Sequence, residues 1–365
     1  MMRICFAAPA NSAHIQKWCE WFLARGHEVH VISFTEGTLP GAVVHRIDLG
    51  VDPDGSDRGK LKYLTAGGKI RRLIREIRPD AVNAHYATSY GAAMALSGVR
   101  GYALSVWGSD IYDFPRRSPL HRRLLQYSLR KAGRLFSTSG AMAAEAAKYT
   151  DRTFDITPFG VDMGLFSPAQ RTRGEDGTFV IGTVKILSSL YGIDTLIRAA
   201  ALLRRSYPEM GLRVRICGDG PQAGEFAALA AEEGIGDITE FPGWISREEA
   251  ARAWADMDAA VIPSARYESF GVAAVEAQAC GTPVIVTEVE GLMETTVPGV
   301  SSLTVPRQDP QALAEAIRTL YLDPERRRRM GQAGRENALE KYELNRCFGK
   351  IEKLLEQLKK GAGRA

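Results

Sequence analysis

The polar stretch QRTRGEDG, residues 170–177, separates two series of short apolar segments, and this division decides the fold that the sequence predicts. Before it, β-rich runs alternate with helical patterns; the runs are MRICFAA (2–8), EVHVISF (28–34), VVHRIDL (43–49), AVNAH (81–85), YALSVW (102–107), RLFSTS (134–139) and DITPFG (155–160). After it, the alternation restarts with FVIGTV (179–184), LRVRICG (212–218), ITEFPG (238–243), AAVIPSA (259–265), PVIVTE (283–288) and SSLTVP (301–306). Strands that alternate with helices form parallel, doubly wound sheets, so the sequence predicts an α/β protein with two Rossmann-like domains facing a central cleft.

The domain boundaries follow from this division. We predict a first domain over residues 1–168, a second over 169–338 and a C-terminal helix over 339–365. Apolar residues recur along the last segment at spacings that broadly form one helical face: Leu339, Tyr342, Phe348, Ile351, Leu354, Leu355 and Leu358. Such a helix is expected to pack back across the first domain. The arginine run 326–329 is interpreted as a solvated helix face in preference to an anion site.

The composition is that of an ordinary globular protein, with 45% hydrophobic and 25% charged residues among 365. It excludes a disordered chain, a collagen-like repeat and a disulfide scaffold. No run reaches the roughly 18 consecutive apolar residues of a membrane span, and the N-terminal stretch is interpreted as a strand, not a secretory signal. The five cysteines are odd in number and far apart, without a CxxC pair, which predicts a reduced cytoplasmic chain without structural zinc.

The net charge of +4 hides an asymmetry along the chain. Residues 1–162 hold 22 basic and 15 acidic side chains, a net charge of +7, whereas residues 163–365 carry a net charge of −3. Within 58–134 there are 16 basic and 4 acidic residues. A clustered basic surface attracts anionic membranes or nucleic acid. No aromatic platform, helix-turn-helix pattern or RNA-binding signature accompanies it, so nucleic acid is not expected as a partner.

The most specific segment, RYESFGVAAVEAQACGTPVIV, covers residues 266–286 between two predicted strands. Its loop can present backbone amides near Phe270 to a phosphate or sugar oxygen. Glu268 can accept hydrogen bonds from sugar hydroxyls, and Glu276 can reach a ribose diol if its helix face lines the cleft. On spacing alone, two glutamates eight residues apart are weak evidence, and a solvated helix is the alternative interpretation.

With its Ser-Phe-Gly context, this segment resembles the Glu-x7-Glu motif of retaining glycosyltransferases of family 4, which have the GT-B fold. The resemblance extends over essentially the whole chain. Its further segments are Phe159-Gly-Val-Asp162 with Phe166-x-Pro168, Cys217-Gly-Asp-Gly-Pro221, Phe241-Pro-Gly-Trp-Ile245 and Ala279-Cys-Gly-Thr-Pro-Val284. It implies that Glu268 contacts the donor sugar and Glu276 the donor ribose.

The resemblance also implies a donor-binding set in the second domain. Its members are Gly218, Asp219, Gly220, Trp244, Ile245, Arg266, Ser269, Phe270, Gly271 and Glu276. Cys280, inside the same segment, is expected to be a packed core residue.

One departure from the family pattern concerns the donor diphosphate. The family usually has an Arg and a Lys in the loop after the first strand of the second domain, and Thr183 stands where the Arg often is. Lys185 lies in this loop, but Leu190 occupies the position of a second Lys that a close branch of the family has. Either Lys185 is the sole cation or an arginine such as Arg266 substitutes, because the departing diphosphate needs positive charge.

In the first domain, Asn11, Ser12 and His14 follow the first strand, where the family usually has a Gly-rich loop. They are predicted on the acceptor side; for His14 the alternative is a helix residue without a catalytic role. Trp107 stands in place of the histidine of the family's His-Gly-x-Asp segment and joins the acceptor side, although an indole cannot titrate.

The catalytic candidates are Glu268, Lys185, His85 and Asp110. His85 follows a predicted strand and is expected to line the cleft. Asp110 is either an acceptor-site carboxylate or a helix N-cap.

No metal or other cofactor is expected, because the nucleotide diphosphate sugar is itself a co-substrate. Asp256-Met-Asp258 has the Asp-x-Asp spacing of metal-dependent sugar transferases of another fold. Here it ends a helix and precedes a strand, which favours turn and capping roles.

Two segments, 69–78 and 116–134, carry the excess positive charge on helices. In the second, Leu120, Leu124 and Tyr127 are predicted to face the sheet, with the basic residues outward. A basic helix face of this kind attracts an anionic leaflet by roughly 1 kcal/mol per residue. Weak, peripheral attachment to the inner face of the plasma membrane is therefore expected.

Together these patterns predict a retaining, metal-independent hexosyltransferase. It would transfer a sugar from a nucleotide diphosphate donor, UDP by preference, to a lipid-linked or cell-surface glycan precursor. The alternatives are a soluble metabolite or natural product as acceptor, and a catalytically weak nucleotide-sugar-binding subunit.

Overall fold

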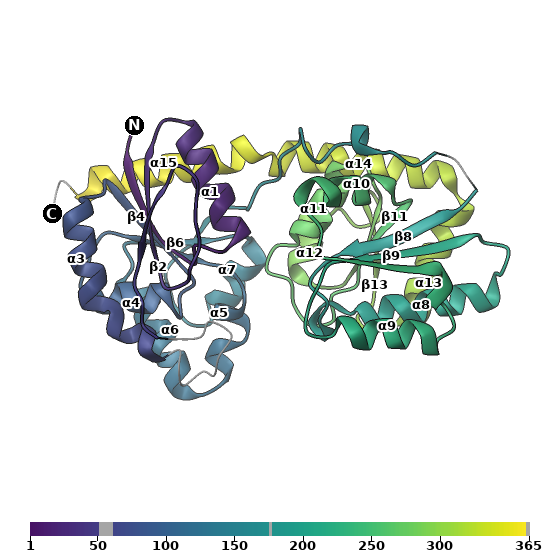
Figure 1. Cartoon of the computed structure of the whole chain (residues 1–365), viewed down its shortest axis with the longest axis horizontal. Helices are drawn as coiled ribbons and strands as arrows, with labels where there is room; N and C mark the ends of the chain where they lie inside the picture. The colour runs from purple at the N-terminus through teal and green to yellow at the C-terminus, as the bar shows by residue number, and fades with distance from the viewer. Residues whose placement is uncertain (51–60, 175–176, 363–365) are drawn as a thin grey trace. The chain divides into compact units, whose positions relative to one another are not determined.

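The computed structural model describes residues 1–50, 61–174 and 177–362. The chain forms two compact units (Figure 1). Unit 1 comprises Met1–Phe159 and Cys347–Ala365, and unit 2 comprises Gly160–Arg346. The division after Phe159 falls earlier than the predicted boundary at residue 168, and it assigns the end of the chain to unit 1.

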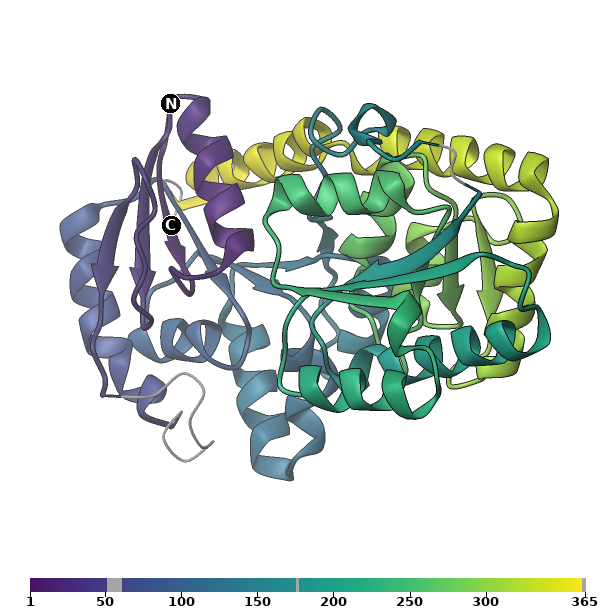
Figure 2. The same cartoon turned by 45° about the vertical axis from the view of Figure 1, so that its right-hand side comes forward.

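Unit 1 is built on a seven-stranded sheet in the order β3-β2-β1-β4-β5-β6-β7, and its strand pairs are parallel. The strands are β1 (Arg3–Ala7), β2 (Glu28–Ser33), β3 (Val43–Arg46), β4 (Ala81–His85), β5 (Ala103–Val106), β6 (Arg134–Ser137) and β7 (Asp155–Ile156). The helical segments are α1 (Ala13–Ala24), η1 (Leu61–Ala66), α3 (Gly67–Ile77), α4 (Tyr90–Ser97), α5 (Ser109–Tyr112), η2 (Phe114–Arg116), α6 (Pro119–Lys131), α7 (Gly140–Ala146) and α15 (Leu344–Ala362), of which the part from Cys347 onward belongs to this unit. Helix α4 packs between α3 and α6 on one face of the sheet, and Figure 2 shows α1 on the face opposite α3.

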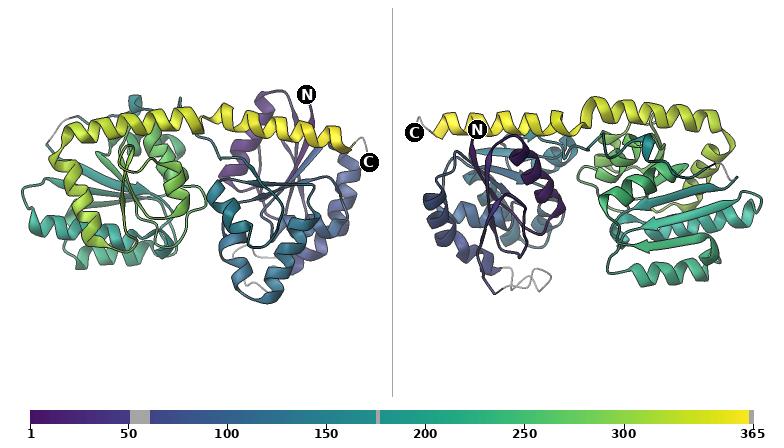
Figure 3. Two further views of the ribbon diagram at one scale, coloured as in Figure 1. Left: turned by 180° about the vertical axis from the view of Figure 1, so that it is seen from behind. Right: turned by 45° about the horizontal axis from the view of Figure 1, so that its top comes forward.

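Unit 2 repeats this topology with six strands in the order β10-β9-β8-β11-β12-β13, also parallel. The strands are β8 (Phe179–Val184), β9 (Leu212–Cys217), β10 (Thr239–Gly243), β11 (Ala259–Ile262), β12 (Val284–Thr287) and β13 (Ser302–Val305). The helical segments are η3 (Pro168–Gln170), η4 (Ser189–Tyr191), α8 (Ile193–Ser206), α9 (Ala223–Glu232), η5 (Gly236–Ile238), α10 (Arg247–Asp256), α11 (Val272–Ala279), α12 (Glu290–Thr295), α13 (Pro310–Leu322) and α14 (Pro324–Tyr342). In Figures 1 and 3 the strands lie between α8 and α9 on one face and α10 and α14 on the other.

Both sheets have the strand order of a Rossmann fold, in which the chain reverses direction across the sheet next to the first strand. This switch point lies between β1 and β4 in unit 1 and between β8 and β11 in unit 2. Buried apolar side chains fill the strands on both sides; β11 and β12 are buried along their whole length. Ligands of such folds bind at the carboxyl ends of the strands at the switch point, which directs the search for a site.

The C-terminal segment departs from the single helix predicted over 339–365. Helix α14 ends at Tyr342, and α15 begins at Leu344. Glu343 between them has extended backbone angles (φ −59°, ψ 135°), and its carboxylate accepts hydrogen bonds from the amides of Asn345 and Arg346 at 2.9 and 2.8 Å. The break therefore arises because Glu343 caps the second helix.

Helix α15 is held in unit 1 by aromatic and charged contacts. The ring of Phe348 lies 5.4 Å from that of Trp18 and 5.5 Å from that of Trp21. Glu352 contacts His27 Nε2 at 2.7 Å and Arg25 Nη2 at 3.1 Å. Of the residues predicted to form one apolar face, Phe348 thus packs on α1, whereas Leu339 and Tyr342 belong to α14, where Leu339 is exposed and Tyr342 packs on Phe270.

All five cysteines are free and buried. Burial raises the pKa of the Cys5, Cys19 and Cys280 thiols to about 12 and that of Cys217 to about 11. Cys280 donates to the carbonyl of Ala251 at 3.5 Å, in keeping with the packed role expected for it.

Candidate active site

An ion pair occupies the switch point of unit 2. Lys185 directly follows β8, and Glu268 lies in the loop after β11. Lys185 Nζ donates to Glu268 Oε2 at 2.8 Å, and the two side chains are 14% and 10% exposed. The ring of Tyr191 lies under the ammonium group, with its centroid 4.3 Å from Nζ. Two of the predicted catalytic residues therefore meet where the fold favours ligand binding.

The surroundings of Lys185 keep it charged. Burial works against the ammonium form, but the carboxylate of Glu268, together with Tyr191 and Glu276, outweighs it and raises the pKa of Lys185. Burial also raises the pKa of the Tyr191 hydroxyl. Lys185 is thus held as an ammonium ion, hydrogen-bonded to the side chain of Glu268.

Glu268 is held by the ends of two neighbouring strands. Ser264, just after β11, donates its hydroxyl to Glu268 Oε2 at 3.1 Å. The carbonyl of Ser264 in turn accepts from Thr287 Oγ1, at the end of β12, at 2.8 Å. The backbone of Gly291 lies so close that a Cβ atom there would stand 2.1 Å from the Glu268 carbonyl oxygen. These contacts fix the orientation of the carboxylate.

Glu276 lies on α11, eight residues further along the chain. It is half-buried, and Oε2 accepts from the indole of Trp254 at 3.4 Å. Helix α11 starts after Gly271, whose φ of +86° lies in the left-handed region that glycine tolerates. Both glutamates of the motif therefore lie close enough to Lys185 to raise its pKa.

The loop after β9 packs directly against the loop after β8. Gly218 has a φ of +126°, and a Cβ atom there would stand 1.9 Å from the carbonyl oxygen of Lys185. Leu187 donates its amide to the carbonyl of Asp219 at 2.9 Å, and Gly218 donates to the carbonyl of Gly243, at the end of β10, at 2.8 Å. Glycine is required here because the two backbones touch.

The remaining predicted donor residues surround this contact. Asp219 is exposed and Gly220 half-buried; Trp244, after β10, is 77% exposed, while Ile245 is half-buried. Ser269 is half-buried, whereas the ring of Phe270 is 1% exposed and packs edge-on against Tyr342 with centroids 5.3 Å apart. Phe270 therefore has a core side chain.

Two positions bear on the missing lysine. Leu190 is half-buried in η4, and its carbonyl accepts from the amide of Ala265 at 2.9 Å. Arg266, which follows Ala265 in the sequence, is exposed. Its carbonyl accepts from Arg307 Nη1 at 3.0 Å.

In unit 1, the residues predicted after β1 have mixed environments. Asn11 is exposed and accepts from Thr35 Oγ1 at 3.1 Å, and Ser12 is the N-cap of α1 without a side-chain capping bond. His14 stacks on Phe159 with centroids 4.4 Å apart and meets Trp107 edge-on at 5.6 Å. The structure thus brings His14 and Trp107 together in an aromatic cluster.

His85 lies in the core of unit 1 and not at its surface. Its side chain is fully buried, with Phe6, Trp18 and Trp107 around it at centroid distances of 5.7, 4.8 and 4.8 Å. Neither ring nitrogen has a hydrogen-bond partner among the described residues. Burial lowers the pKa of His85 to about 3. In this structure the ring cannot touch a substrate, contrary to the expectation that it lines a cleft.

Asp110 joins two strand-end loops. Its carboxylate accepts from the amide of Ala87, after β4, at 2.9 Å and from those of Trp107 and Gly108, after β5, at 3.2 and 2.8 Å. The side chain is 1% exposed. Burial raises the pKa of Asp110, and the three backbone amides oppose that rise. Asp110 is not the helix N-cap that was the alternative prediction, because it lies inside α5, whose N-cap is Gly108. Its buried carboxylate instead ties the loop after β4 to the loop after β5.

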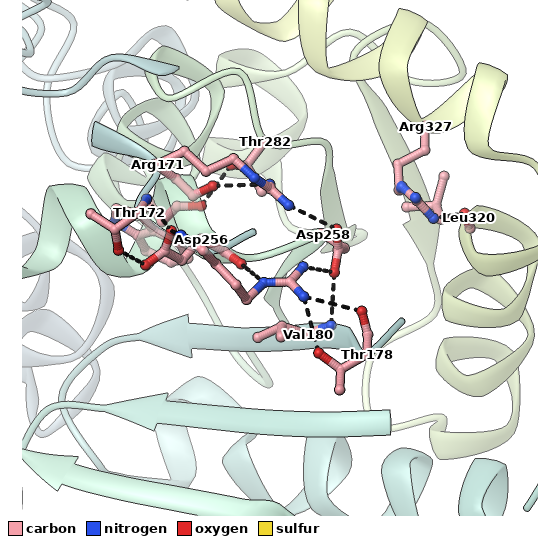
Figure 4. A network of polar contacts seen from close by, with 12 residues as sticks. Arg171, Thr172, Thr178, Val180, Asp256, Asp258, Thr282, Leu320 and Arg327 are labelled. Atoms are coloured by element: carbon pink, nitrogen blue, oxygen red, sulfur yellow. Dashed lines mark hydrogen bonds and ion pairs between the residues drawn. The ribbon is translucent and has the colours of Figure 1, made fainter. Parts of the chain in front are cut away.

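Asp256 and Asp258 bind the segment that precedes β8 in unit 2 (Figure 4). Asp256 accepts from Thr172 N and Oγ1, both at 2.7 Å, and from Arg173 N at 2.8 Å. Asp258 pairs with Arg173 and accepts from Val180 N at 2.9 Å. Burial opposes ionisation of Asp256, but these hydrogen bonds lower its pKa. The Asp-x-Asp pair therefore fastens the polypeptide at the amino ends of β8 and β11.

The basic side chains of α3 and α6 are exposed, but the buried face of α6 differs from the predicted one. On α3, Ile70 and Ile77 are buried while Lys69, Arg71, Arg72 and Arg75 are exposed. On α6 the buried line is Leu125, Ser128 and Leu129, and Leu120, predicted to face the sheet, is 72% exposed. Leu120 lies in the first turn of α6. Arg122 and Arg123 beside it are exposed.

Sequence reasoning missed Ser264 and Tyr191. Ser264 directly follows a buried strand at the switch point, a position that could have marked it. Tyr191 precedes Gly192, whose φ of +65° turns the chain into α8. None of the helices in the described part of the chain combines the length and apolar character needed to span a bilayer.

Comparison with known proteins defines the class. Sucrose-phosphate synthase from Thermosynechococcus elongatus superposes with a TM-score of 0.83 at 22% identity, covering 98% of this chain and 99% of that one. HepE from Anabaena, in complex with UDP and glucose, gives a TM-score of 0.81 at 20% identity, covering 97% and 99%. The two parallel Rossmann-like sheets thus have the GT-B fold.

The family follows from the sequence matches. Residues 169–337 match the family described as Glycosyl transferases group 1, and residues 3–139 match Glycosyl transferase 4-like. A D-inositol 3-phosphate glycosyltransferase from Pseudarthrobacter chlorophenolicus is 32% identical over 286 residues, 73% of this chain and 68% of that protein. One from an Arthrobacter species is 31% identical over 328 residues, 80% and 75% of the two chains. The chain belongs to the family 4, or group 1, glycosyltransferases.

Proposed function

We propose that this glycosyltransferase transfers a sugar from a nucleotide diphosphate sugar, with UDP as the nucleotide, to an acceptor hydroxyl with retention of anomeric configuration. The observation that carries the proposal is the Lys185–Glu268 pair at the switch point of unit 2, with Glu276 close enough to influence Lys185. That the related HepE was solved with UDP and glucose supports the choice of nucleotide.

Glu268 would position the donor sugar. Lys185 and Ser264 both donate to Oε2, which leaves Oε1 as an acceptor for a sugar hydroxyl. Trp244, largely exposed at the end of β10, offers a flat surface for the base, and Glu276 an acceptor for the ribose. The donor would then lie across the carboxyl ends of β10, β9, β8 and β11.

Transfer would proceed by front-face attack. The acceptor oxygen bonds to the anomeric carbon on the face from which the diphosphate leaves, and the departing phosphate oxygen takes the acceptor proton. Positioning and electrostatic stabilisation, not a titrating protein base, would supply the catalysis. No metal ion enters this scheme; its cations are protein side chains.

Two acceptor classes are supported by separate observations. The exposed basic faces of α3 and α6 favour an acceptor at an anionic membrane, such as a lipid-linked or cell-surface glycan precursor, reached by peripheral attachment. The names of the relatives, D-inositol 3-phosphate glycosyltransferases, favour a soluble phosphorylated metabolite instead. Both are anionic, in agreement with the positive half of the sequence.

The donor is tested by thermal shift with UDP-, GDP-, ADP- and dTDP-sugars, since a selective ligand raises the melting temperature by mass action. Transfer is then measured with the selected donor and either D-inositol 3-phosphate or anionic vesicles carrying a lipid-linked sugar. A donor that binds without transfer or hydrolysis would indicate a nucleotide-sugar-binding subunit. A chain that binds none of the four donors would contradict the proposal.

A further inference from the structure

The candidate donor site has little positive charge to offer a diphosphate. Lys185 contributes one positive charge and is paired with Glu268, while Glu276 adds a second negative charge nearby. Leu190 contributes none. Phosphate groups in proteins are held by charge-assisted hydrogen bonds. Cations that are not already neutralised are therefore needed close to Glu268.

An arginine from another strand reaches the Glu268 loop. Arg307 follows β13 by two residues, and in the sheet β12 separates β13 from β11. Arg307 Nη1 nevertheless donates to the carbonyl oxygen of Arg266 at 3.0 Å. Since neighbouring strands lie about 4.8 Å apart, the side chain must extend past the carboxyl end of β12. It approaches the site from the side opposite to β10.

The backbone around Arg307 directs it there. Gln308 has a φ of +57°, which is uncommon for a residue with a side chain and turns the chain sharply. Asp309 then caps α13 by accepting the amide of Ala312 at 2.9 Å. Arg307 is thus the last residue before a tightly constrained turn.

Arg307 and Arg266 both remain available to a ligand. Both side chains are exposed, and neither guanidinium forms an ion pair with a carboxylate in residues 1–50, 61–174 and 177–362. Arg266 also adjoins the position of the missing lysine, because its neighbour Ala265 is hydrogen-bonded to Leu190 at 2.9 Å.

We propose that Arg307, together with Arg266, binds the phosphate of the donor that is attached to the sugar. This inference rests on the proposed function. The base is assigned to Trp244 at the β10 side, so a cation that enters from the β13 side meets the sugar end of the diphosphate first. Arg307 thereby takes over the charge that a lysine at position 190 would supply.

The test is isothermal titration of UDP and UMP into the full chain. UDP carries the second phosphate and UMP lacks it. Arg307→Gln is expected to weaken UDP binding about tenfold, the size of one charged hydrogen bond, and to leave UMP binding within about twofold. Arg307→Lys should recover part of the UDP affinity. Arg213→Gln is the matched control, because Arg213 is exposed but lies near the amino end of β9.

The outcomes separate the two proposals. Unchanged UDP binding by folded Arg307→Gln, or equal losses for UDP and UMP, would overturn the role of Arg307 while leaving the donor assignment intact. Absence of UDP binding by the wild-type chain would instead count against UDP as the donor nucleotide. A selective loss for UDP, with melting temperatures matched to wild type, would support Arg307 as a residue of the donor site.

Discussion

The two switch points have the same strand order but opposite chemistry. In unit 2, Lys185 and Glu268 meet as a partly exposed ion pair beside Tyr191. In unit 1, His85 ends β4 within a ring of aromatic side chains, and Asp110 is fully occupied by backbone amides. Exposed basic side chains of unit 1 lie instead on α3 and α6. Topology therefore supplies equivalent positions, and the side chains decide which becomes a site.

The largest expected effect comes from the charged switch point. Glu268→Gln keeps the shape of the side chain but removes the charge opposite Lys185, and we expect kcat to fall about 100- to 1000-fold. Initial rates of transfer measure this, with Glu232→Gln on the exposed side of α9 as the control. Near-normal turnover would mean that the ion pair has only a structural role. The difference between the charged switch point of unit 2 and the aromatic one of unit 1 would then not bear on catalysis.

The next effect concerns the backbone contact beside Lys185. Gly218→Ala places a Cβ atom 1.9 Å from the Lys185 carbonyl at a φ of +126°. We expect unfolding free energy to fall by about 1–3 kcal/mol, with weaker UDP binding. Gly224→Ala on α9, which has no atom within 4 Å of the added Cβ, should gain about 0.5–1 kcal/mol. Equal denaturation curves for both variants would remove the argument for close loop packing.

A smaller, pH-dependent effect is expected in unit 1. His85 has a pKa of about 3 when folded and 6.5 when unfolded, so the unfolded chain takes up a proton first as the pH falls. The contribution of the neutral His85 ring to the free energy of unfolding is fully present above pH 6.5. At pH 5 the free energy of unfolding is lower by about 2 kcal/mol. In His85→Phe this loss should disappear, as urea unfolding at pH 7.5 and pH 5 will measure.

Transfer activity of the same variant sharpens the comparison. Because His85 is a buried core residue, we expect folded His85→Phe to retain turnover within a few-fold of wild type. Loss of turnover without loss of stability would return His85 to the catalytic residues and make the two switch points more alike.

The smallest expected effect concerns vesicle binding by the exposed basic residues of unit 1. Arg123→Gln on α6 should weaken co-sedimentation with phosphatidylserine vesicles by about 1 kcal/mol at low salt, and the difference should vanish at high ionic strength. Arg252→Gln, an exposed arginine on α10 of unit 2, is the control. Equal losses for the two variants would show that the position of the charge does not matter.

The sequence predicted most of the sheet architecture because parallel strands are buried on both faces and form continuous apolar runs. The segments FVIGTV and AVNAH, for example, are β8 and β4 without a change of bounds. Helix ends were less predictable, because they depend on local capping: the break at Glu343 arises from two hydrogen bonds that no apolar periodicity records.

The candidate site was predicted in part. Glu268 and Lys185 were named from a motif and lie together, 83 residues apart in sequence. Sequence could not show that His85 is enclosed, since that depends on Trp18 and Trp107, which come from distant segments. Nor could it find Arg307, whose contact with the Glu268 loop depends on the order of strands in the sheet.

The buried thiols have a practical consequence for measuring motion. Maleimides react with the thiolate form, so five buried cysteines, four of which have pKa values raised by burial, give little background labelling. A cysteine introduced at an exposed position of each unit, such as Arg123 and Arg252, can carry a fluorophore or spin label in the otherwise unaltered chain. The distance between the labels, followed as UDP is added, would then report directly whether the units move when the donor binds.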